Sequence, residues 1–380
     1  MDILLATPLL GGITPQTFMR RHWQKKPLLI RQAVPGGIDL SSRSQLFELA
    51  ARDDVESRLI VHDAGRWSLR HGPLKRWAIP SLKQARWTLL VQGLDLHVSA
   101  AHDLLKRFRF VPDARLDDLM LSYASEGGGV GPHVDSYDVF LLQARGRRRW
   151  RIGRARNLAW LPDVPLKILA HFEPEQEWLL EPGDMLYLPP GWAHDGVAEG
   201  ECLTASIGFR APGRDQIGRE VLQRLLDEAE TAQPDALYRD PKQTATDEPA
   251  RIPEELRAFA VDAMTKLLAD RRGLDCALGE VLSELKAGVW FDPPAAAPGV
   301  KGVTLDRRTR MLYDDRHVFI NGESYQASGR DAKLIRRLAD CRSLSGVEHR
   351  LLSAQARALL DGWASDGWLH HGVVRNEGEV

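Results

Sequence analysis

The chain has 380 residues and a net charge of −1, with 51 Lys and Arg against 52 Asp and Glu. The length exceeds one ordinary domain, and the near-neutral charge argues against a nonspecific nucleic-acid binder. The three cysteines have no paired spacing, and the chain lacks both a leader-like N-terminus and an apolar run of about 18 residues. We therefore expect a cytoplasmic protein with free thiols that does not span a membrane.

The N-terminal part mixes a few helices with many short strands, and it ends at the Ala-Pro-Gly sequence at 211–213. We predict a first domain over residues 1–212. Apolar periodicity and turn residues predict its elements. They are helices at 15–23, 42–50 and 100–108, a strand at 139–143, a turn at 144–146, a second strand at 147–152 and a buried strand at 185–188.

Residues 213–270 have a helical pattern. Apolar residues recur at helical spacing in 217–226 and in 256–268, and a polar segment at 231–251 separates them. Such apolar stripes need a partner surface. That surface is either the chain's own first domain or a second copy of the chain.

Residues 271–380 predict a small module of helices and strands. The Asn321-Gly322 pair is a strong hairpin signal, helical patterns occupy 330–341 and 353–362, and 368–370 is a closing strand. Helices combined with a β wing indicate a winged-helix-like fold. Acidic residues lie in and near the 330–341 helix, so we expect protein contacts here and no direct DNA binding.

His133 and Asp135 follow a glycine-rich segment at positions i and i+2, and His194 follows the Pro-Pro-Gly sequence at 189–191. Residues two apart on a strand point the same way. Two histidines and one carboxylate form the ligand set of the non-haem Fe(II) oxygenases. A short His-x-Asp motif also arises by chance, but these flanks place both histidines beside strand ends and favour a metal site.

The strand after the predicted turn places Arg148, Trp150 and Ile152 on one face, and the two apolar residues mark that face as the inner one. A buried arginine needs an anion, because an unpaired charge inside a protein is costly. A carboxylate fits the guanidinium in a bidentate way. We expect Phe140 and Leu142, together with Trp150, to form dry apolar walls of the site.

Residues 119–152, 178–194 and 208–212 closely resemble the JmjC/cupin-type ribosomal oxygenases, and within them most nearly the bacterial ribosomal protein arginine 3-hydroxylases. The N-terminal residues from Phe18 to Leu28 carry a further signature of that family, and the resemblance extends over the whole chain. It implies an α+β protein in which a double-stranded β-helix of the JmjC/cupin type precedes a helical region that forms a homodimer (213–270) and the winged-helix-like domain (271–380).

The resemblance also implies the contents of the site. Fe(II) would be held by His133, Asp135 and His194, and 2-oxoglutarate, with O₂ as the second cosubstrate, by Arg148. In the family a hydroxyl residue on the strand before the first histidine helps to bind the distal carboxylate of 2-oxoglutarate. The matching position here is Ala124, so the neighbouring Ser125 is the candidate hydroxyl.

Two further residues are assigned to the substrate by weaker analogy. Tyr137 would line the substrate pocket, and Asp118 would meet a cationic side chain. The implied reaction adds a hydroxyl to the β-carbon of an arginine in a large-subunit ribosomal protein, the one called L-sixteen.

Three alternatives stay open at this point. A ribosomal histidine hydroxylase would share the iron site and differ in the pocket. A cupin metalloenzyme without 2-oxoglutarate is disfavoured by an inward Arg148. A transcription factor that uses the C-terminal module is disfavoured by the intact ligand set and the near-neutral charge.

Overall fold

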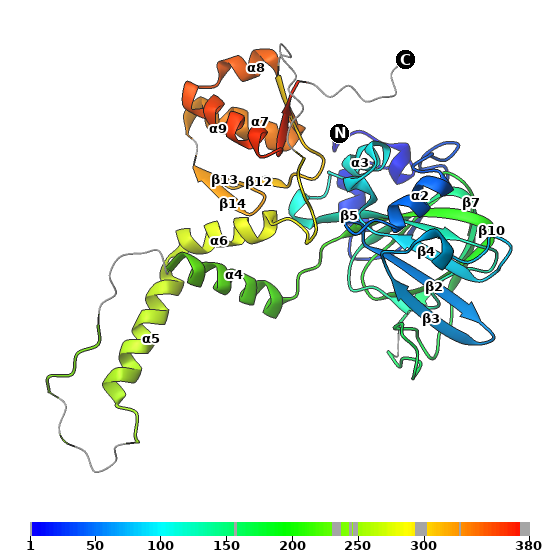
Figure 1. The fold of residues 1–380 in the computed structure, drawn as a ribbon, viewed down its shortest axis with the longest axis horizontal. Helices are drawn as coiled ribbons and strands as arrows, with labels where there is room; N and C mark the ends of the chain where they lie inside the picture. Colours follow the sequence, from blue (N-terminus) through cyan, green and yellow to red (C-terminus); the bar gives the residue numbers. More distant parts are fainter. Residues whose placement is uncertain are drawn as a thin grey trace. The chain divides into compact units, whose positions relative to one another are not determined.

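The computed structural model describes residues 2–155, 158–229, 237–242, 245, 250–292, 302–326 and 328–372. The chain forms two compact units (Figure 1). The first contains the residues up to Ala211 together with Ala287–Trp290. The second contains Pro212–Lys286 and the described residues between Phe291 and Gly372.

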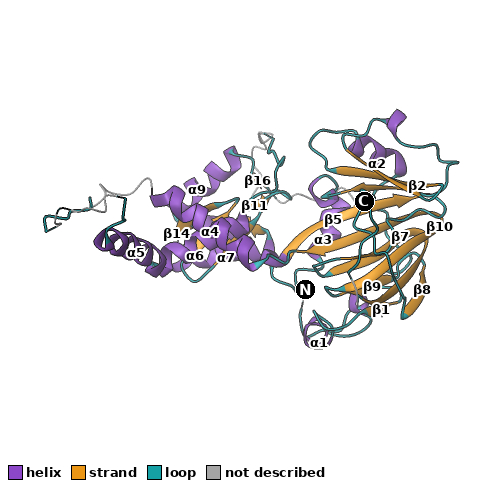
Figure 2. Ribbon diagram, turned by 90° about the horizontal axis from the view of Figure 1, so that it is seen from below, coloured by secondary structure: helices purple, strands orange, loops and turns teal. Residues whose placement is uncertain are grey.

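The first unit is built on one antiparallel sheet in the order β1-β9-β7-β10-β5-β4-β2-β3, with β6 paired to β10 and β8 to β7. In Figure 2 these strands fill the unit and its short helices lie at the margin. The strands are β1 (Leu28–Ile30), β2 (Ser57–Asp63), β3 (Arg66–His71), β4 (Trp87–Val91), β5 (Leu116–Ala124), β6 (His133–Val134), β7 (Val139–Arg154), β8 (Gln176–Leu180), β9 (Met185–Leu188) and β10 (Trp192–Phe209).

The helices of the first unit begin where the sequence offers capping residues. The side chains of Thr14 and Ser42 accept hydrogen bonds from the backbone N–H groups three residues on, which satisfies donors that the first helical turn leaves unpaired. The three predicted helices are confirmed to within about two residues at each end. The helices are α1 (Pro15–Arg21), α2 (Arg43–Ala50), α3 (Ser99–Lys106) and the short 3₁₀ helices η1 (Pro8–Leu10), η2 (Arg76–Ala78), η3 (Leu94–Leu96) and η4 (Asp113–Arg115).

The predicted turn at 144–146 is wrong, because β7 runs through it as one strand paired with β10. The pairing is irregular there: Leu203 lies opposite Arg145, but Thr204 lies opposite Gln143. Ala144 is therefore an extra residue on β7, a β-bulge. Gly146, in the same stretch, has a φ of 68°, the left-handed region that glycine adopts without strain.

The bulge reverses the alternation of side chains along β7. Before it, Phe140 and Leu142 lie in the large core cluster on one side of the sheet. Val139 and Leu141 instead share a cluster with Trp150, which lies beyond the bulge. The expectation that Phe140 and Leu142 line the site is therefore wrong. Their neighbours Val139 and Leu141 line it instead.

The second unit combines helices with two three-stranded sheets, β15-β11-β16 and β12-β13-β14. The predicted Asn321-Gly322 hairpin is confirmed between β13 and β14, with positive φ at both residues. The elements are α4 (Arg214–Ala229), α5 (Glu254–Ala269), α6 (Arg271–Ser283), β11 (Gly302–Leu305), β12 (Met311–Tyr313), β13 (His317–Ile320), β14 (Glu323–Gln326), α7 (Gly329–Cys341), β15 (Ser343–Ser345), α8 (Gly346–Leu351), α9 (Ala354–Ser365) and β16 (Leu369–His371).

The two helices of the predicted helical region differ in their packing. Leu225 of α4 is buried, and its side chain lies against Gly273 of α6. In contrast, no residue of α5 is buried. The polar connection predicted at 231–251 lies largely outside the described residues. The division of this unit into a helical region (213–270) and a winged-helix-like domain (271–380) stays a prediction.

No helix in the described ranges is both long and apolar enough to cross a bilayer. The cysteines Cys202, Cys276 and Cys341 are all free thiols.

Candidate active site

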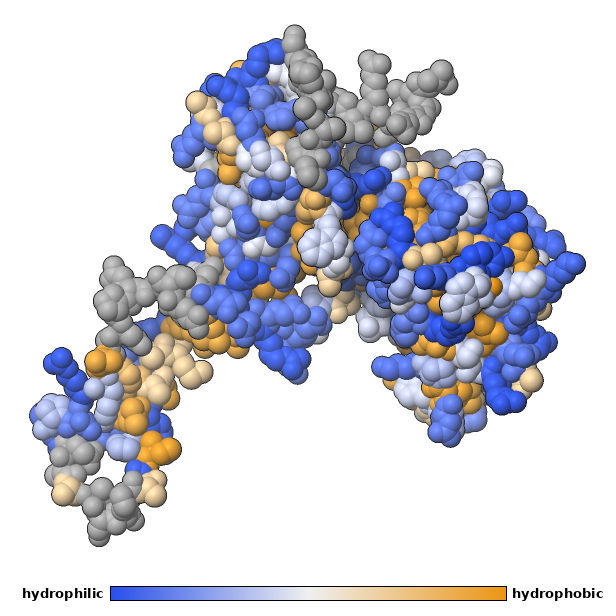
Figure 3. All heavy atoms as spheres, viewed as in Figure 1, coloured by the Kyte–Doolittle hydropathy of each residue, from blue (hydrophilic) through white to orange (hydrophobic). Residues whose placement is uncertain are grey.

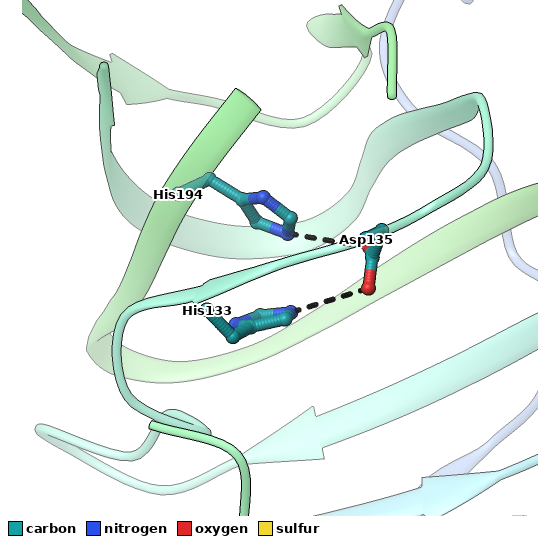
Figure 4. A group of neighbouring side chains, drawn as sticks. All are labelled: His133, Asp135 and His194. Carbon is teal, nitrogen blue, oxygen red and sulfur yellow. Dashed lines mark ion pairs between the residues drawn. The ribbon is translucent and has the colours of Figure 1, made fainter. Parts of the chain in front are cut away.

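His133, Asp135 and His194 come together as the sequence predicts. His133 on β6 lies directly opposite His194 on β10, and Asp135 follows two residues after His133, on the same side. The Asp135 carboxylate lies 4.0 Å from His133 Nε2 and 3.6 Å from His194 Nε2 (Figure 4). One ligand atom from each residue lies within 4.8 Å of the other two.

Backbone carbonyls orient both imidazole rings. His133 Nδ1 lies 2.9 Å from the carbonyl oxygen of Gly131, and His194 Nδ1 lies 3.1 Å from that of Trp192. A carbonyl only accepts, so this geometry assigns the hydrogen to Nδ1 in each ring and leaves the Nε2 lone pair facing Asp135. Burial, reinforced by the neighbouring His133, lowers the pKa of His194 to about 4, which keeps that ring neutral and able to bind a metal.

These residues fit a divalent cation. Two neutral imidazoles and one carboxylate converge from one side and leave the remaining coordination positions facing a cavity of about 350 Å³. The cavity extends from the three residues along β5, β2 and β7, and Val139, Leu141 and Trp150 form part of its apolar wall.

Arg148 lies on the wall of this cavity, as predicted, and its side chain is buried. Nη2 donates to the carbonyl oxygen of Gly196 at 3.1 Å, and Nη1 donates to two hydroxyls. Nε is buried without a hydrogen-bond partner. No acidic side chain in the described ranges forms an ion pair with Arg148, and burial lowers the pKa of its guanidinium.

A buried guanidinium with an unsatisfied N–H and no carboxylate beside it is costly by itself. It fits a dicarboxylate cosubstrate whose far end reaches the wall while its near end reaches the metal position. Gly196 makes room for this arrangement, because a Cβ there would lie 2.7 Å from the Trp150 ring and 2.8 Å from Arg148 Nε.

The two hydroxyls that touch Arg148 belong to Ser122 on β5 and Thr204 on β10, at 3.2 and 3.4 Å from Nη1. Sequence reasoning missed both. It placed the family's hydroxyl position at Ala124, but Ser122 lies on the same strand face two residues earlier. Period-2 alternation counted back from Ala124 could have found it.

The Ser125 candidate is wrong. Its hydroxyl is buried against the backbone of Trp87, accepting from the N–H at 3.1 Å and donating to the carbonyl at 3.4 Å. It comes directly after the end of β5 and is not among the residues that line the cavity.

Asp118 and Tyr137 both line the same cavity. Asp118 is buried and accepts hydrogen bonds from the Gln92 side chain at 2.7 Å and from the backbone N–H of Gly93 at 3.0 Å. Burial, followed by the negative charge of Asp135, raises the pKa of Tyr137, so its phenol stays protonated near neutral pH.

The sheet and site define an oxygenase domain of the JmjC class followed by a winged helix. A JmjC domain model matches residues 103–217, and a ROXA-like winged-helix model matches residues 266–370. The chain belongs to the family of JmjC-domain ribosomal oxygenases. It is 36% identical to the ribosomal protein uL16 3-hydroxylase of Escherichia coli over 283 residues, 73% of each chain.

Solved structures of the E. coli ribosomal oxygenase YcfD are similar along nearly the whole chain. The X-ray structure has a TM-score of 0.79 at 30% identity and covers 93% of this chain and 97% of its own. The structure of YcfD in complex with cobalt and 2-oxoglutarate has a TM-score of 0.78 at 30% identity, with the same coverage.

Proposed function

We propose that this protein is an Fe(II)- and 2-oxoglutarate-dependent dioxygenase that hydroxylates the β-carbon of an arginine in the large-subunit ribosomal protein uL16, the protein called L-sixteen above. One observation carries the proposal: the His133–Asp135–His194 set faces the same cavity as Arg148, which forms no ion pair with an acidic side chain of the described residues. The E. coli relative is named for the hydroxylation of uL16, and YcfD has been solved with 2-oxoglutarate.

In this proposal His133, Asp135 and His194 hold the iron, and the Asp135 carboxylate offsets part of its charge. When bound, Fe(II), 2-oxoglutarate and O₂ supply the oxidising chemistry, and the protein supplies binding, orientation and a shielded site. Arg148 receives the far carboxylate of 2-oxoglutarate. The hydroxyls of Ser122 and Thr204 hold the Arg148 guanidinium in place for that contact.

The substrate side of the cavity favours a cation. Asp118 supplies a negative charge whose orientation is fixed by Gln92 and Gly93, and Tyr137 supplies a neutral phenol that can donate a hydrogen bond. A guanidinium offers five donors in a planar fork and suits a carboxylate acceptor. A neutral histidine would use that charge less well, so we favour arginine over histidine as the hydroxylated residue.

We also propose that the protein works in the cytoplasm as a homodimer. The location follows from its substrate, which is a ribosomal protein. The dimer is supported by the apolar side chains that α5 leaves exposed, among them Leu256, Phe259 and Met264. In Figure 3 hydrophobic side chains (orange) lie uncovered along this helix.

The test uses matched uL16 peptides that carry either arginine or histidine at the target position. We expect a gain of one oxygen on the arginine peptide when Fe(II) and 2-oxoglutarate are present, measured by mass spectrometry. Asp135→Ala should abolish turnover and weaken Fe(II) binding. Asp118→Ala should reduce peptide hydroxylation far more than peptide-free 2-oxoglutarate turnover. Preference for the histidine peptide, or no oxygen on either peptide, contradicts the arginine assignment.

A further inference from the structure

Gln143 is a fully buried polar residue on β7 that lies next to the bulge and is not among the residues that line the cavity. Its side-chain Nε2 donates to the carbonyl oxygens of Arg145 and Gly146, at 2.9 and 3.3 Å. Both carbonyls belong to the irregular stretch of β7. The bulge therefore takes up both N–H groups of the amide.

These two bonds fix which way round the amide lies. Carbonyl oxygens only accept, so the nitrogen of Gln143 must face them and Oε1 must face the opposite side. On that side Thr204 Oγ1 lies 3.0 Å from Gln143 Oε1. Because Oε1 is an acceptor as well, the Thr204 hydroxyl has to donate its one hydrogen to Gln143.

With its hydrogen used in this way, the Thr204 oxygen offers only lone pairs to Arg148 Nη1, which lies 3.4 Å away. The hydrogen of Ser122 is committed similarly, because that hydroxyl donates to the carbonyl oxygen of Thr204 at 3.2 Å. Both hydroxyls therefore accept from Nη1. The Thr204 hydrogen, held by Gln143 Oε1, is therefore directed away from the guanidinium.

We infer that Gln143 is a positioning residue for the cosubstrate: through the bulge carbonyls and Thr204, it sets the direction of the hydrogen bonds that hold Arg148 toward the cavity. This inference rests on the proposed function, because it concerns the residue assigned to the far carboxylate of 2-oxoglutarate. It also gives the bulge a second role besides reversing the alternation of side chains along β7: its carbonyl oxygens fix the orientation of the Gln143 amide.

The experiment titrates Mn(II)-loaded full-length protein with 2-oxoglutarate and measures Kd by calorimetry. Thr204→Val removes the hydroxyl and keeps the shape, and Gln143→Met removes the amide. Each should weaken 2-oxoglutarate binding about tenfold, the scale of one hydrogen bond to a charged group. The double variant should lose little more than either single variant, because both act along one path. Mn(II) affinity should stay unchanged.

Two controls make the result specific. Thr204→Ser keeps the hydroxyl and should bind 2-oxoglutarate nearly as well as the unmodified protein. Thr265→Val removes a hydroxyl that bonds only within exposed α5 and should have no effect. If Gln143→Met fails to fold, equal Kd values for Thr204→Val and Thr204→Ser overturn the inference.

The outcomes separate this inference from the proposed function. Absence of 2-oxoglutarate binding by the unmodified protein overturns the proposed function and the inference with it. If the unmodified protein binds and Gln143→Met binds equally well but melts at a lower temperature, Gln143 only braces the bulge, and the inference alone fails.

Discussion

Arg148 carries a positive charge in a buried position. Because such a charge is costly without an anion, its role can be tested. Lysine at this position keeps the charge but loses the planar fork and the simultaneous contacts with two hydroxyls and the Gly196 carbonyl. We expect Arg148→Lys to raise the 2-oxoglutarate Kd about 10- to 100-fold, with little change in metal affinity. Calorimetry on the Mn(II)-loaded protein measures both quantities.

The matched control is Arg147→Lys, because Arg147 is exposed on the other face of β7. It should bind 2-oxoglutarate like the unmodified protein. Equal effects of the two substitutions would mean that the inward side chain of Arg148 is not the cosubstrate contact.

At this scale the sequence predicted what depends on one strand alone. The i, i+2 spacing placed His133 and Asp135 together, and the Trp150–Ile152 alternation turned Arg148 inward. Ser122 could have been found by counting back two residues from Ala124, but Thr204 could not be predicted, because its contact with Arg148 depends on how β10 and β7 pair. Ser125 was chosen for its hydroxyl, but that hydroxyl bonds to the backbone of Trp87 and does not line the cavity.

At the scale of elements, α4 and α5 allow a residue in a core to be distinguished from a residue at a subunit interface. Leu225 is 4% exposed and packs within the second unit, whereas Phe259 is 39% exposed. A buried charge without a partner destabilises the fold strongly. We expect Leu225→Glu to lower the melting temperature and Phe259→Glu to yield folded monomers. Light scattering with circular dichroism distinguishes the two. A monomeric unmodified protein at micromolar concentration would rule out the dimer.

A second element-scale prediction concerns Asp306, which follows β11. Burial alone would raise the pKa of this carboxyl, but hydrogen bonds from His370 and Arg308 hold the pKa far below its ordinary range. Its stabilising contribution is therefore present above the unfolded pKa of about 4 and is lost as the pH falls below it.

Asp306→Asn should remove this dependence. Denaturant unfolding between about pH 6 and pH 3 should show a stability gap between the two proteins that narrows as the pH falls. A gap that stays constant over that range would contradict the ionic role of Asp306.

Element prediction succeeded where periodicity is strong and capping residues are present, as in α2 after Ser42 and in the Asn321-Gly322 hairpin. It failed at 144–146. Gly146 with its flanking polar residues has the composition of a turn, yet β10 supplies a matching irregularity that lets β7 continue. Such a feature is a property of two strands, so neither sequence segment reveals it by itself.

At the scale of the whole molecule, each unit has its own hydrophobic core, while the metal ligands and Arg148 all belong to the first. A ligand stabilises only the folded form that binds it. We expect calorimetry to resolve two unfolding transitions, of which Mn(II) with 2-oxoglutarate raises only one. At about 100 times Kd the gain is about 2.7 kcal/mol.

Asp135→Ala should abolish this shift and leave the second transition in place. Equal movement of both transitions would show that the units unfold together and that the ligand stabilises them jointly.

The extra residue on β7 also has a consequence for how this sequence can change over time. Substitutions along the strand alter one side chain each, but a one-residue deletion at Ala144 would invert every side chain on one flank of the bulge relative to the other. Either Val139 and Leu141 or Arg148 and Trp150 would then face away from the cavity. We therefore expect selection to act more strongly on the length of the chain at this point than on the residue type, so that homologous chains tolerate different residues here more readily than a gap.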